Sequence, residues 1–169
     1  TVNELVRASF DMGEVKTGAL IVVEQAVVLA EYETTGIPMD CIISHQVLIN
    51  IFEHNTPLHD GAIIVRGDRI VSATCYLPLS DNMDISKELG TRHRAAIGMS
   101  EISDALVIVV SEETGYVSVA LGGKLVRNIT PEYLKERLES IRRKKTEKTG
   151  WKLLAAWKGR RKHEKKADE

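Results

Sequence analysis

Apolar residues along the chain recur with two spacings, one typical of amphipathic helices and the other typical of strands. The helical spacing predicts a first helix that ends near Gly13, and later helices over 44–52, 91–103 and 131–141. Ser44, Thr91 and Thr130 are residue types that cap helix N-termini, and Pro131 suits the first helical position. Helices are therefore expected at intervals along most of the chain.

Short apolar runs rich in β-branched residues predict strands between these helices. They lie at 18–24, 41–43, 105–111 and 116–121, with two more inside 62–79 that Gly67-Asp68 joins as a hairpin. Residues 31–40 contain Gly36 and Pro38, which favour turns, and are predicted to form a loop. Helices interspersed with strands and hairpins indicate a mixed α/β domain.

Charge divides the 169-residue chain into two parts that its net charge of −1 conceals. Residues 1–141 hold 11 Lys and Arg against 20 Asp and Glu, whereas residues 142–169 hold 12 against 4. The length suits one domain with a real core, and 43% hydrophobic residues is an ordinary globular value. We expect a folded domain over 1–141 and a basic, flexible tail over 142–169 that can contact anionic lipid or a regulator.

Several classes of protein are excluded or disfavoured. Cys41 and Cys75 are the only cysteines, so neither a disulfide framework nor a structural zinc site is indicated, and a reducing compartment fits. The segment "LGGKL" does not match a P-loop, and no GxGxxG follows a strand. The chain has no apolar run of the roughly 18 residues that span a membrane. It begins at Thr1, inside a predicted helix, so we expect it to be part of a longer protein.

The first polar cluster is "HDG", which directly precedes the predicted strand at 62–66. The ends of strands are where ligand sites of α/β domains usually form. His59 and Asp60 can bind a divalent ion or exchange a proton with a hydroxyl, and Gly61 allows a ligand close to the backbone. Taken alone, the cluster is better explained as a turn that His59 caps.

Two further clusters lie at predicted element ends. Arg92, His93 and Arg94 fall in the first turn of a helix, where positive charge opposes the helix dipole unless an anion binds there. The alternative is pairing with nearby acidic residues. "SEETG" follows the most apolar strand; Ser111 can bind phosphate and the adjacent glutamates a metal, or the segment is an ordinary acidic turn. Together the three clusters favour metal-assisted phosphoryl or nucleotidyl transfer.

The segments "NTPLHDGA", "ELGTRHRAA" and "SEETG" resemble the signature of the diadenylate cyclase (DAC) domain, and the resemblance extends from about residue 16 to 139. It is most similar to the membrane-anchored bacterial type. The resemblance implies a twisted mixed β-sheet flanked by helices. It also implies that two ATP molecules are condensed to cyclic di-AMP and two pyrophosphates, with Mg²⁺ or Mn²⁺, by a homodimer whose subunits meet face to face.

The same resemblance assigns roles to individual residues. Asp60 would position and help deprotonate the 3′-hydroxyl of ATP. The residues implied in catalysis are Asp60, Gly61, Ala62, Arg92, His93 and Arg94. Those implied in nucleotide binding are Thr91, Ser111 and Glu112 for the phosphates, and Tyr76 and Leu77 for adenine, although Tyr76 equally suits the core. The implied metal ligands are His59, Asp60 and Glu113.

Two other functions remain as alternatives. A catalytically silent domain that senses ATP or a cyclic dinucleotide would bind nucleotide without releasing pyrophosphate. A nucleic-acid binder would act through the basic tail, but the tail carries no recognisable reading motif, so no nucleic acid is expected as a partner. For the cyclase, the expected location is the cytoplasmic face of the bacterial cell membrane, and a regulatory protein is a possible partner.

Overall fold

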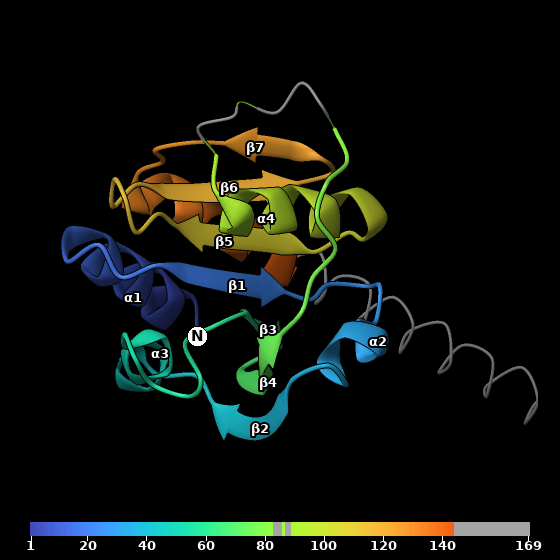
Figure 1. Cartoon of the computed structure of the whole chain (residues 1–169), viewed down its shortest axis with the longest axis horizontal. Coiled ribbons are helices and arrows are strands. Elements are labelled where there is room, and N and C mark those ends of the chain that lie inside the picture. The colour runs from blue at the N-terminus through green and yellow to red at the C-terminus, as the bar shows by residue number, and fades with distance from the viewer. Residues whose placement is uncertain (83–85, 87–88, 144–169) are drawn as a thin grey trace, which may run out of the picture. The chain divides into compact units, whose positions relative to one another are not determined.

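A mixed seven-stranded sheet in the order β2-β4-β3-β1-β5-β6-β7 forms the centre of the fold (Figure 1). β1 and β3 run parallel, and all other neighbouring strands are antiparallel. The strand bounds are β1 Ala19–Val23, β2 Ile37–Ile42, β3 Ala62–Arg66, β4 Arg69–Cys75, β5 Leu106–Val110, β6 Val117–Leu121 and β7 Lys124–Val126. The α/β class with a mixed sheet, expected from the sequence, is confirmed.

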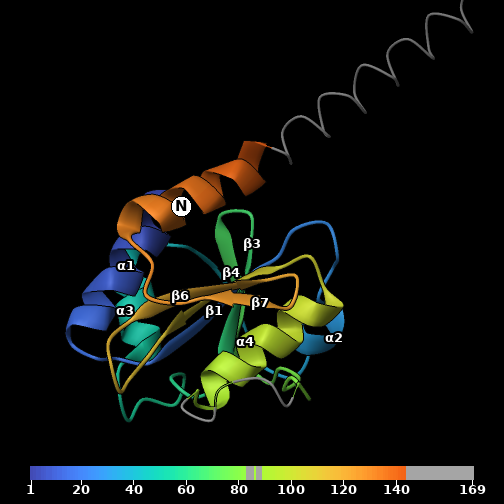
Figure 2. The ribbon, with the colours of Figure 1, turned by 90° about the horizontal axis from the view of Figure 1, so that it is seen from above.

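Helices cover both faces of this sheet (Figure 2). Their bounds are α1 Val2–Glu14, α2 Ala30–Glu33, α3 His45–Phe52 and α4 Thr91–Ile102, and residues 131–143 are also helical. α4 packs against β1, β5 and β6, whereas α1 packs against α3, β5 and β6 from the opposite side. The first turn of α4 thereby comes to lie beside the end of β5, where the candidate site forms.

The structure, a computed structural model, describes residues 1–82, 86 and 89–143. It divides into one compact unit, Thr1–Lys135, and a second that begins at Glu136. Most of the basic tail expected over 142–169 lies outside the described residues, as does most of its charge. Within the described part, no helix is both long and apolar enough to cross a membrane.

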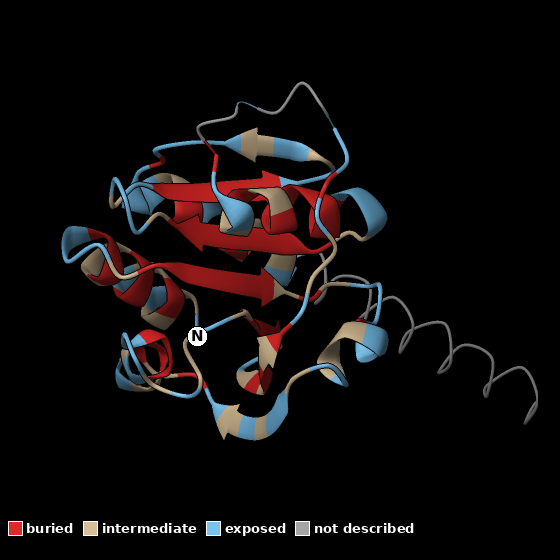
Figure 3. Cartoon of the chain, viewed as in Figure 1, coloured by how far each residue is buried: buried red, intermediate tan, exposed pale blue. Residues whose placement is uncertain are grey.

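The core forms because the central strands are apolar on both faces (Figure 3). All five residues of β5 are buried, as are the first four of β1. Side chains alternate between faces along a strand, so Leu20 and Val22 of β1 pack with Ala96 and Met99 of α4, while Ile21 points to the other side. Burial on both sides is typical of a strand in the middle of a helix-covered sheet.

Most predicted elements are confirmed, with two exceptions. Gly67, at a positive φ of 68°, forms the turn between β3 and β4, and Ser44 Oγ accepts a hydrogen bond from Val47 N at 3.2 Å as the cap of α3. The predicted loop at 31–40 is wrong, because it contains part of α2 and most of β2. Pro38 is tolerated there because β2 is an edge strand. The short strand β7 has no predicted counterpart.

Candidate functional site

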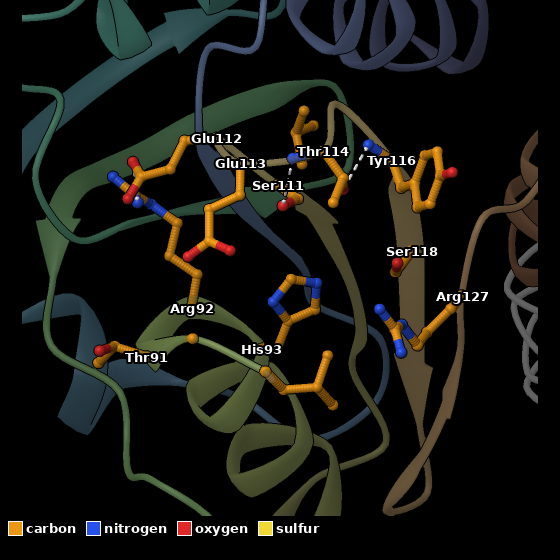
Figure 4. A pocket seen from close by; sticks show the side chains of 13 residues that line it. Thr91, Arg92, His93, Ser111, Glu112, Glu113, Thr114, Tyr116, Ser118 and Arg127 are labelled. Carbon is orange, nitrogen blue, oxygen red and sulfur yellow. Dashed lines mark hydrogen bonds and ion pairs between the residues drawn. The ribbon is translucent and has the colours of Figure 1, made fainter. Parts of the chain in front are cut away.

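A pocket of about 100 Å³, partly open to solvent, lies between the first turn of α4 and the turn that follows β5 (Figure 4). Its walls bring together two clusters that the sequence separates by about twenty residues. Thr91, Arg92 and His93 come from α4, and the residues from the turn are Ser111, Glu112, Glu113 and Thr114. The antiparallel pairing of β5 with β6 places this turn opposite the helix.

The N-terminus of α4 supplies free backbone donors to this pocket. Gly90, with an extended backbone, is the N-cap, so the predicted capping by Thr91 is wrong. Thr91 is instead the first helical residue, and its hydroxyl makes no cap hydrogen bond. The N–H groups of His93 and Arg94 both donate to Gly90 O, at 3.1 and 3.2 Å, whereas those of Thr91 and Arg92 lack intrahelical acceptors. No acidic residue stands in the first turn to complement them. This end of α4 is suited to binding an anion.

Arg92 is held in place by Glu112. Arg92 Nη1 donates to Glu112 Oε2 at 2.6 Å, which orients the guanidinium across the pocket wall. Gly18, just before β1, makes room for the pair, because a Cβ there would lie 2.9 Å from Glu112 Oε2 and 3.0 Å from Arg92 Cζ. Arg92 therefore does pair with an acidic residue, which was the alternative to anion binding. The Glu112 side chain remains more than half exposed, so Arg92 can exchange it for a ligand.

His93 is the most buried residue of the three in the first turn. Burial is the main cause that lowers its pKa below 6.5; the positive charge of Arg127 lowers it further, and Glu113 partly opposes the shift. His93 is consequently a neutral imidazole at pH 7, rather than a third cation. A neutral ring can donate one hydrogen bond into the pocket without adding net charge.

The turn after β5 is ordered by its own hydrogen bonds. Ser111 Oγ accepts from Thr114 N at 3.2 Å, and Gly115 N donates to Ser111 O at 2.9 Å. Because the Ser111 hydroxyl is an acceptor in the first of these bonds, its own proton stays available to a ligand. Ser111 is thus a preorganised donor at the pocket mouth.

A second pocket adjoins the first and leads to the "HDG" cluster. It shares Arg92 and Glu112 with the first pocket and is also lined by Lys16, Thr17, Gly18, His54 and His59. His59 Nδ1 lies 2.6 Å from Thr56 O. Because a carbonyl oxygen only accepts, Nδ1 carries the proton and Nε2 keeps a free lone pair. All three polar clusters therefore contribute to two pockets with a common wall.

Asp60 is exposed and, among the residues that the structure describes, has no hydrogen-bond or ion-pair partner. Gly61 has a positive φ of 96°, and a Cβ on it would lie 2.8 Å from the backbone of Thr74. Thr74 sits at a β-bulge of β4 with φ 56°. The fold itself thus requires glycine at position 61, and Ala62 follows as the buried first residue of β3.

Six predicted site residues do not line either pocket: Asp60, Gly61 and Ala62, described above, and Tyr76, Leu77 and Arg94. Tyr76 is 74% exposed, so it is not a core residue. Leu77 is half-buried against the core cluster that includes Ala95. Arg94 is two positions from Arg92, which places the two side chains on different faces of α4. Their roles in nucleotide binding stay predictions.

The residues expected to bind metal do not form a closed protein site. Over the described ranges, no group of three or more His, Cys, Asp or Glu side chains is close enough to hold a metal ion. His59 and Glu113 line different pockets. Mg²⁺, however, is usually bound by one or two carboxylates together with substrate phosphates and waters, so an incomplete protein ligand set suits it.

Sequence reasoning missed several residues of these pockets, among them Gly18, Ser118 and Arg127. The sequence gives no sign of the role of Gly18, because a small residue just before an apolar strand is common. Ser118 and Arg127 line the pocket from β6 and from the residue that follows β7. Ser118 looks like an ordinary position of an alternating strand, and no local motif surrounds Arg127. Only knowledge of the β6–β7 hairpin would have identified them.

Comparison with known proteins places these features in a family. Residues 6–125 match the DAC family model, described as DisA bacterial checkpoint controller nucleotide-binding. The chain is 51% identical over 149 residues to cyclic di-AMP synthase CdaA of Bacillus subtilis strain 168, and 49% identical over 152 residues to a diadenylate cyclase of Listeria monocytogenes. Each alignment covers 88% of this chain but only 55% and 54% of the relative, so the chain spans about half of their length.

Solved structures support the same relationship. A crystal structure of DacA from Staphylococcus aureus matches with a TM-score of 0.81 and 50% identity, covering 83% of this chain and 93% of that chain. A Bacillus cereus protein described as a hypothetical membrane spanning protein matches with a TM-score of 0.74 and 45% identity, covering 76% and 63% of the two chains.

Proposed function

The chain belongs to the DAC family, and from this premise we propose that it is a diadenylate cyclase that converts two ATP molecules into cyclic di-AMP and two pyrophosphates. In each half-reaction, a 3′-oxygen would attack the α-phosphorus of the other nucleotide. One P–O bond forms, the bond to pyrophosphate breaks, and the hydroxyl proton is released. Two such transfers close the ring.

The observation that carries this proposal is the shared wall of the two pockets. Arg92 and Glu112 belong to both, so donors for phosphate on one side and His59 on the other border the same space. The free N–H groups of α4, the Ser111 hydroxyl and the Arg92 guanidinium can stabilise the negative charge that grows on pyrophosphate as it leaves. A neutral His93 would add a hydrogen bond there.

Asp60 is the proposed base for the 3′-hydroxyl. It is exposed, and among the described residues no partner occupies its carboxylate. Its neighbour in the chain, His59, lines the second pocket, and an exposed carboxylate at this position is suited to reach a nucleotide on a second subunit. We therefore propose a face-to-face homodimer, in which each chain contributes half of the reacting assembly.

A divalent cation, Mg²⁺ or Mn²⁺, fits the donors available here. Either His59, through its free Nε2 lone pair, with Asp60 next to it in the chain, or Glu113 on the wall of the other pocket would hold it together with phosphate oxygens of ATP. When bound, the cation would neutralise phosphate charge and favour ionisation of the attacking hydroxyl. The protein's own part is to orient these donors.

The setting of the reaction is also proposed from relatives. We propose that the chain works at the cytoplasmic face of the bacterial membrane as part of a longer anchored protein. The Bacillus cereus relative is described as membrane spanning, and the curated relatives are nearly twice as long as the matched region. A regulatory protein is a further proposed partner.

The first test is to incubate the chain with ATP and either Mg²⁺ or Mn²⁺ over a range of protein concentrations and to identify products by mass. We expect cyclic di-AMP, with a rate that rises more than linearly with protein concentration while dimers are scarce. ATP that is bound but unchanged under every condition would contradict the cyclase and favour the nucleotide sensor.

Replacing the proposed base is the second test. Asp60→Asn should lower product formation by about 10²- to 10⁴-fold, the usual contribution of a general base, and leave ATP affinity within about twofold. Asp68→Asn is the matched control, because Asp68 lies in the turn at the other end of β3. Full turnover by Asp60→Asn would remove Asp60 from the reaction.

A further inference from the structure

The inner part of the first pocket contains a buried hydroxyl without a partner. Ser118, on β6, is 1% exposed, and its Oγ makes no hydrogen bond within the described part of the chain. A buried polar group without a partner costs about 1–3 kcal/mol. Ser118 nevertheless lines the pocket rather than the sheet core, so a ligand that enters the pocket can satisfy it.

Arg127 stands beside this hydroxyl (Figure 4). It follows β7 directly and lines the same pocket, yet in the described ranges its guanidinium makes no ion pair or side-chain hydrogen bond. Arg66 and Arg69, by contrast, are each paired with carboxylates. Arg127 therefore adds an unpaired positive charge to the pocket.

His93 completes the group from the facing helix. In Figure 4 its ring lies between Glu113 on one side and Ser118 with Arg127 on the other. The described residues offer no hydrogen-bond partner to the ring. Thus a hydroxyl, a guanidinium and an imidazole border one part of the pocket, and the acidic side chain near them, Glu113, is bonded to none of the three.

The unpaired hydrogen-bond donors of this part of the pocket indicate the chemistry of the ligand that it binds. A ligand group with several negatively charged oxygens satisfies a hydroxyl, a forked guanidinium and a ring N–H at once, which a neutral or cationic group does not. A phosphoryl group has this chemistry. The free N–H groups at the start of α4 lie on the neighbouring wall, so a chain of phosphates can extend from one set of donors to the other.

We propose that Ser118, Arg127 and His93 form a phosphoryl subsite that binds the terminal phosphate of the nucleoside triphosphate and retains pyrophosphate as it leaves. This inference rests on the proposed function for the identity of the nucleotide. It assigns the β6–β7 hairpin, which lies outside the three sequence clusters, a direct part in substrate binding.

The test compares ligands that differ only in phosphates. Affinities are measured by calorimetry for ATP lacking its 3′-hydroxyl, which cannot cyclise, for the matching monophosphate and for inorganic pyrophosphate. Arg127→Ala and Ser118→Ala should each weaken binding of the triphosphate and of pyrophosphate about tenfold, as expected for a hydrogen bond to a charged group. Both should leave monophosphate binding within about twofold.

Controls separate the subsite from general effects of charge and folding. Lys124→Ala removes a cation of β7 that does not line the pocket and should change none of the affinities. Arg127→Lys should recover part of the triphosphate affinity. Because Arg127 is exposed, its variants should fold even if Ser118→Ala does not.

Several outcomes would overturn the subsite. These are unchanged triphosphate affinity in Arg127→Ala, equal losses for the monophosphate, or a loss restricted to free pyrophosphate. Product formation by the unmodified chain is measured in parallel. If the chain makes no cyclic di-AMP but the phosphate-dependent losses occur, the proposed function fails and the subsite stands; if product forms but affinities are unchanged, only the subsite fails.

Discussion

Two groups of charged and polar side chains in this fold contrast in how far the chain satisfies them. Around Arg66, on β3, every contact is internal: Arg66 Nε donates to Glu24 Oε1 at 2.6 Å and Arg66 Nη2 donates to Glu33 Oε2 at 2.6 Å. Glu24 Oε2 also accepts from Leu29 N. In the pocket, by contrast, Arg127 and Ser118 have no partner in the part of the chain that the structure describes.

The presence or absence of internal partners distinguishes charged groups that stabilise the fold from polar groups that are available to bind a ligand. The Glu24 side chain is only 4% exposed, and two carboxylates raise the pKa of Arg66 above its usual value, so this cluster stays ionised and paired. The bond between Arg66 of β3 and Glu33 of α2 connects this helix to the sheet. The pocket cluster leaves donors unpaired although partners of either sign are abundant in the chain. Pairing with a buried carboxylate, as at Glu24, therefore indicates a structural role, whereas unpaired donors in a pocket, or a donor paired only with an exposed carboxylate, indicate ligand binding.

The largest expected effect comes from breaking the paired cluster. Arg66→Ala would leave the buried Glu24 carboxylate without its main partner and should lower the free energy of unfolding by about 3 kcal/mol. Urea unfolding measures the change. Arg69→Ala removes an arginine from an exposed pair with Asp40 and should cost less than about 1 kcal/mol. Equal losses in the two variants would contradict the structural role of Arg66.

The pocket should respond in the opposite way. Arg92→Ala removes a donor whose partner Glu112 is exposed, so stability should change by less than about 1 kcal/mol. Affinity for the triphosphate analogue should fall about 10- to 100-fold, because a phosphate contact is lost and Glu112 is left unneutralised. Calorimetry with Arg69→Ala as the control measures this. A destabilised protein with normal affinity would reverse the assignment.

A pH titration tests the environment of His93. Its pKa in the folded state is lowered by burial and by Arg127, so below about pH 6.5 the unfolded chain binds this proton more readily than the folded one. His93 therefore makes stability fall as the pH decreases through that range, and its full contribution is present above it. Urea unfolding from pH 5.5 to 8 should show a shallower pH dependence in His93→Gln. Parallel curves for the two proteins would contradict a lowered pKa.

The smallest expected effect concerns the space around the Arg92–Glu112 pair. Gly18→Ala would place a Cβ against the flexible ends of both side chains, which can shift by a few tenths of an ångström. We expect a loss of a few-fold in triphosphate affinity and little change in thermal stability. Steady-state kinetics and a melting curve measure both. An affinity equal to that of the unmodified chain would show that the pair tolerates displacement.

Local rules were enough to predict much of this architecture. The turn at Gly67, the cap at Ser44 and the buried strand β5 follow from residue type and spacing within a few positions. The failures were cases in which distant partners decide. Residues 37–42 become a strand because β4 offers an open edge, despite Pro38. Thr91 lies inside α4 because Gly90 adopts the extended capping conformation.

For the site, the sequence by itself determined its chemistry. The anion-binding helix start, the hydroxyl at position 111 and the carboxylates beside it were identifiable, because each function depends on residues adjacent in the chain. Their resemblance to the DAC domain named the family that the comparisons then supported. Residues adjacent in the chain lie close together in any fold, so motifs made of adjacent residues can be identified from the sequence alone.

Only the tertiary structure decided which of these residues share a wall and what else faces them. Pairing of β5 with β6 and of β6 with β7 brings Ser118 and Arg127 opposite His93, across sequence separations of about 25 to 35 residues. The same packing lowers the pKa of His93, which the sequence left as a potential cation. Burial and the nearby charges set the pKa of His93, and burial leaves the Ser118 hydroxyl without a partner. Both effects depend on neighbours that only the folded chain supplies.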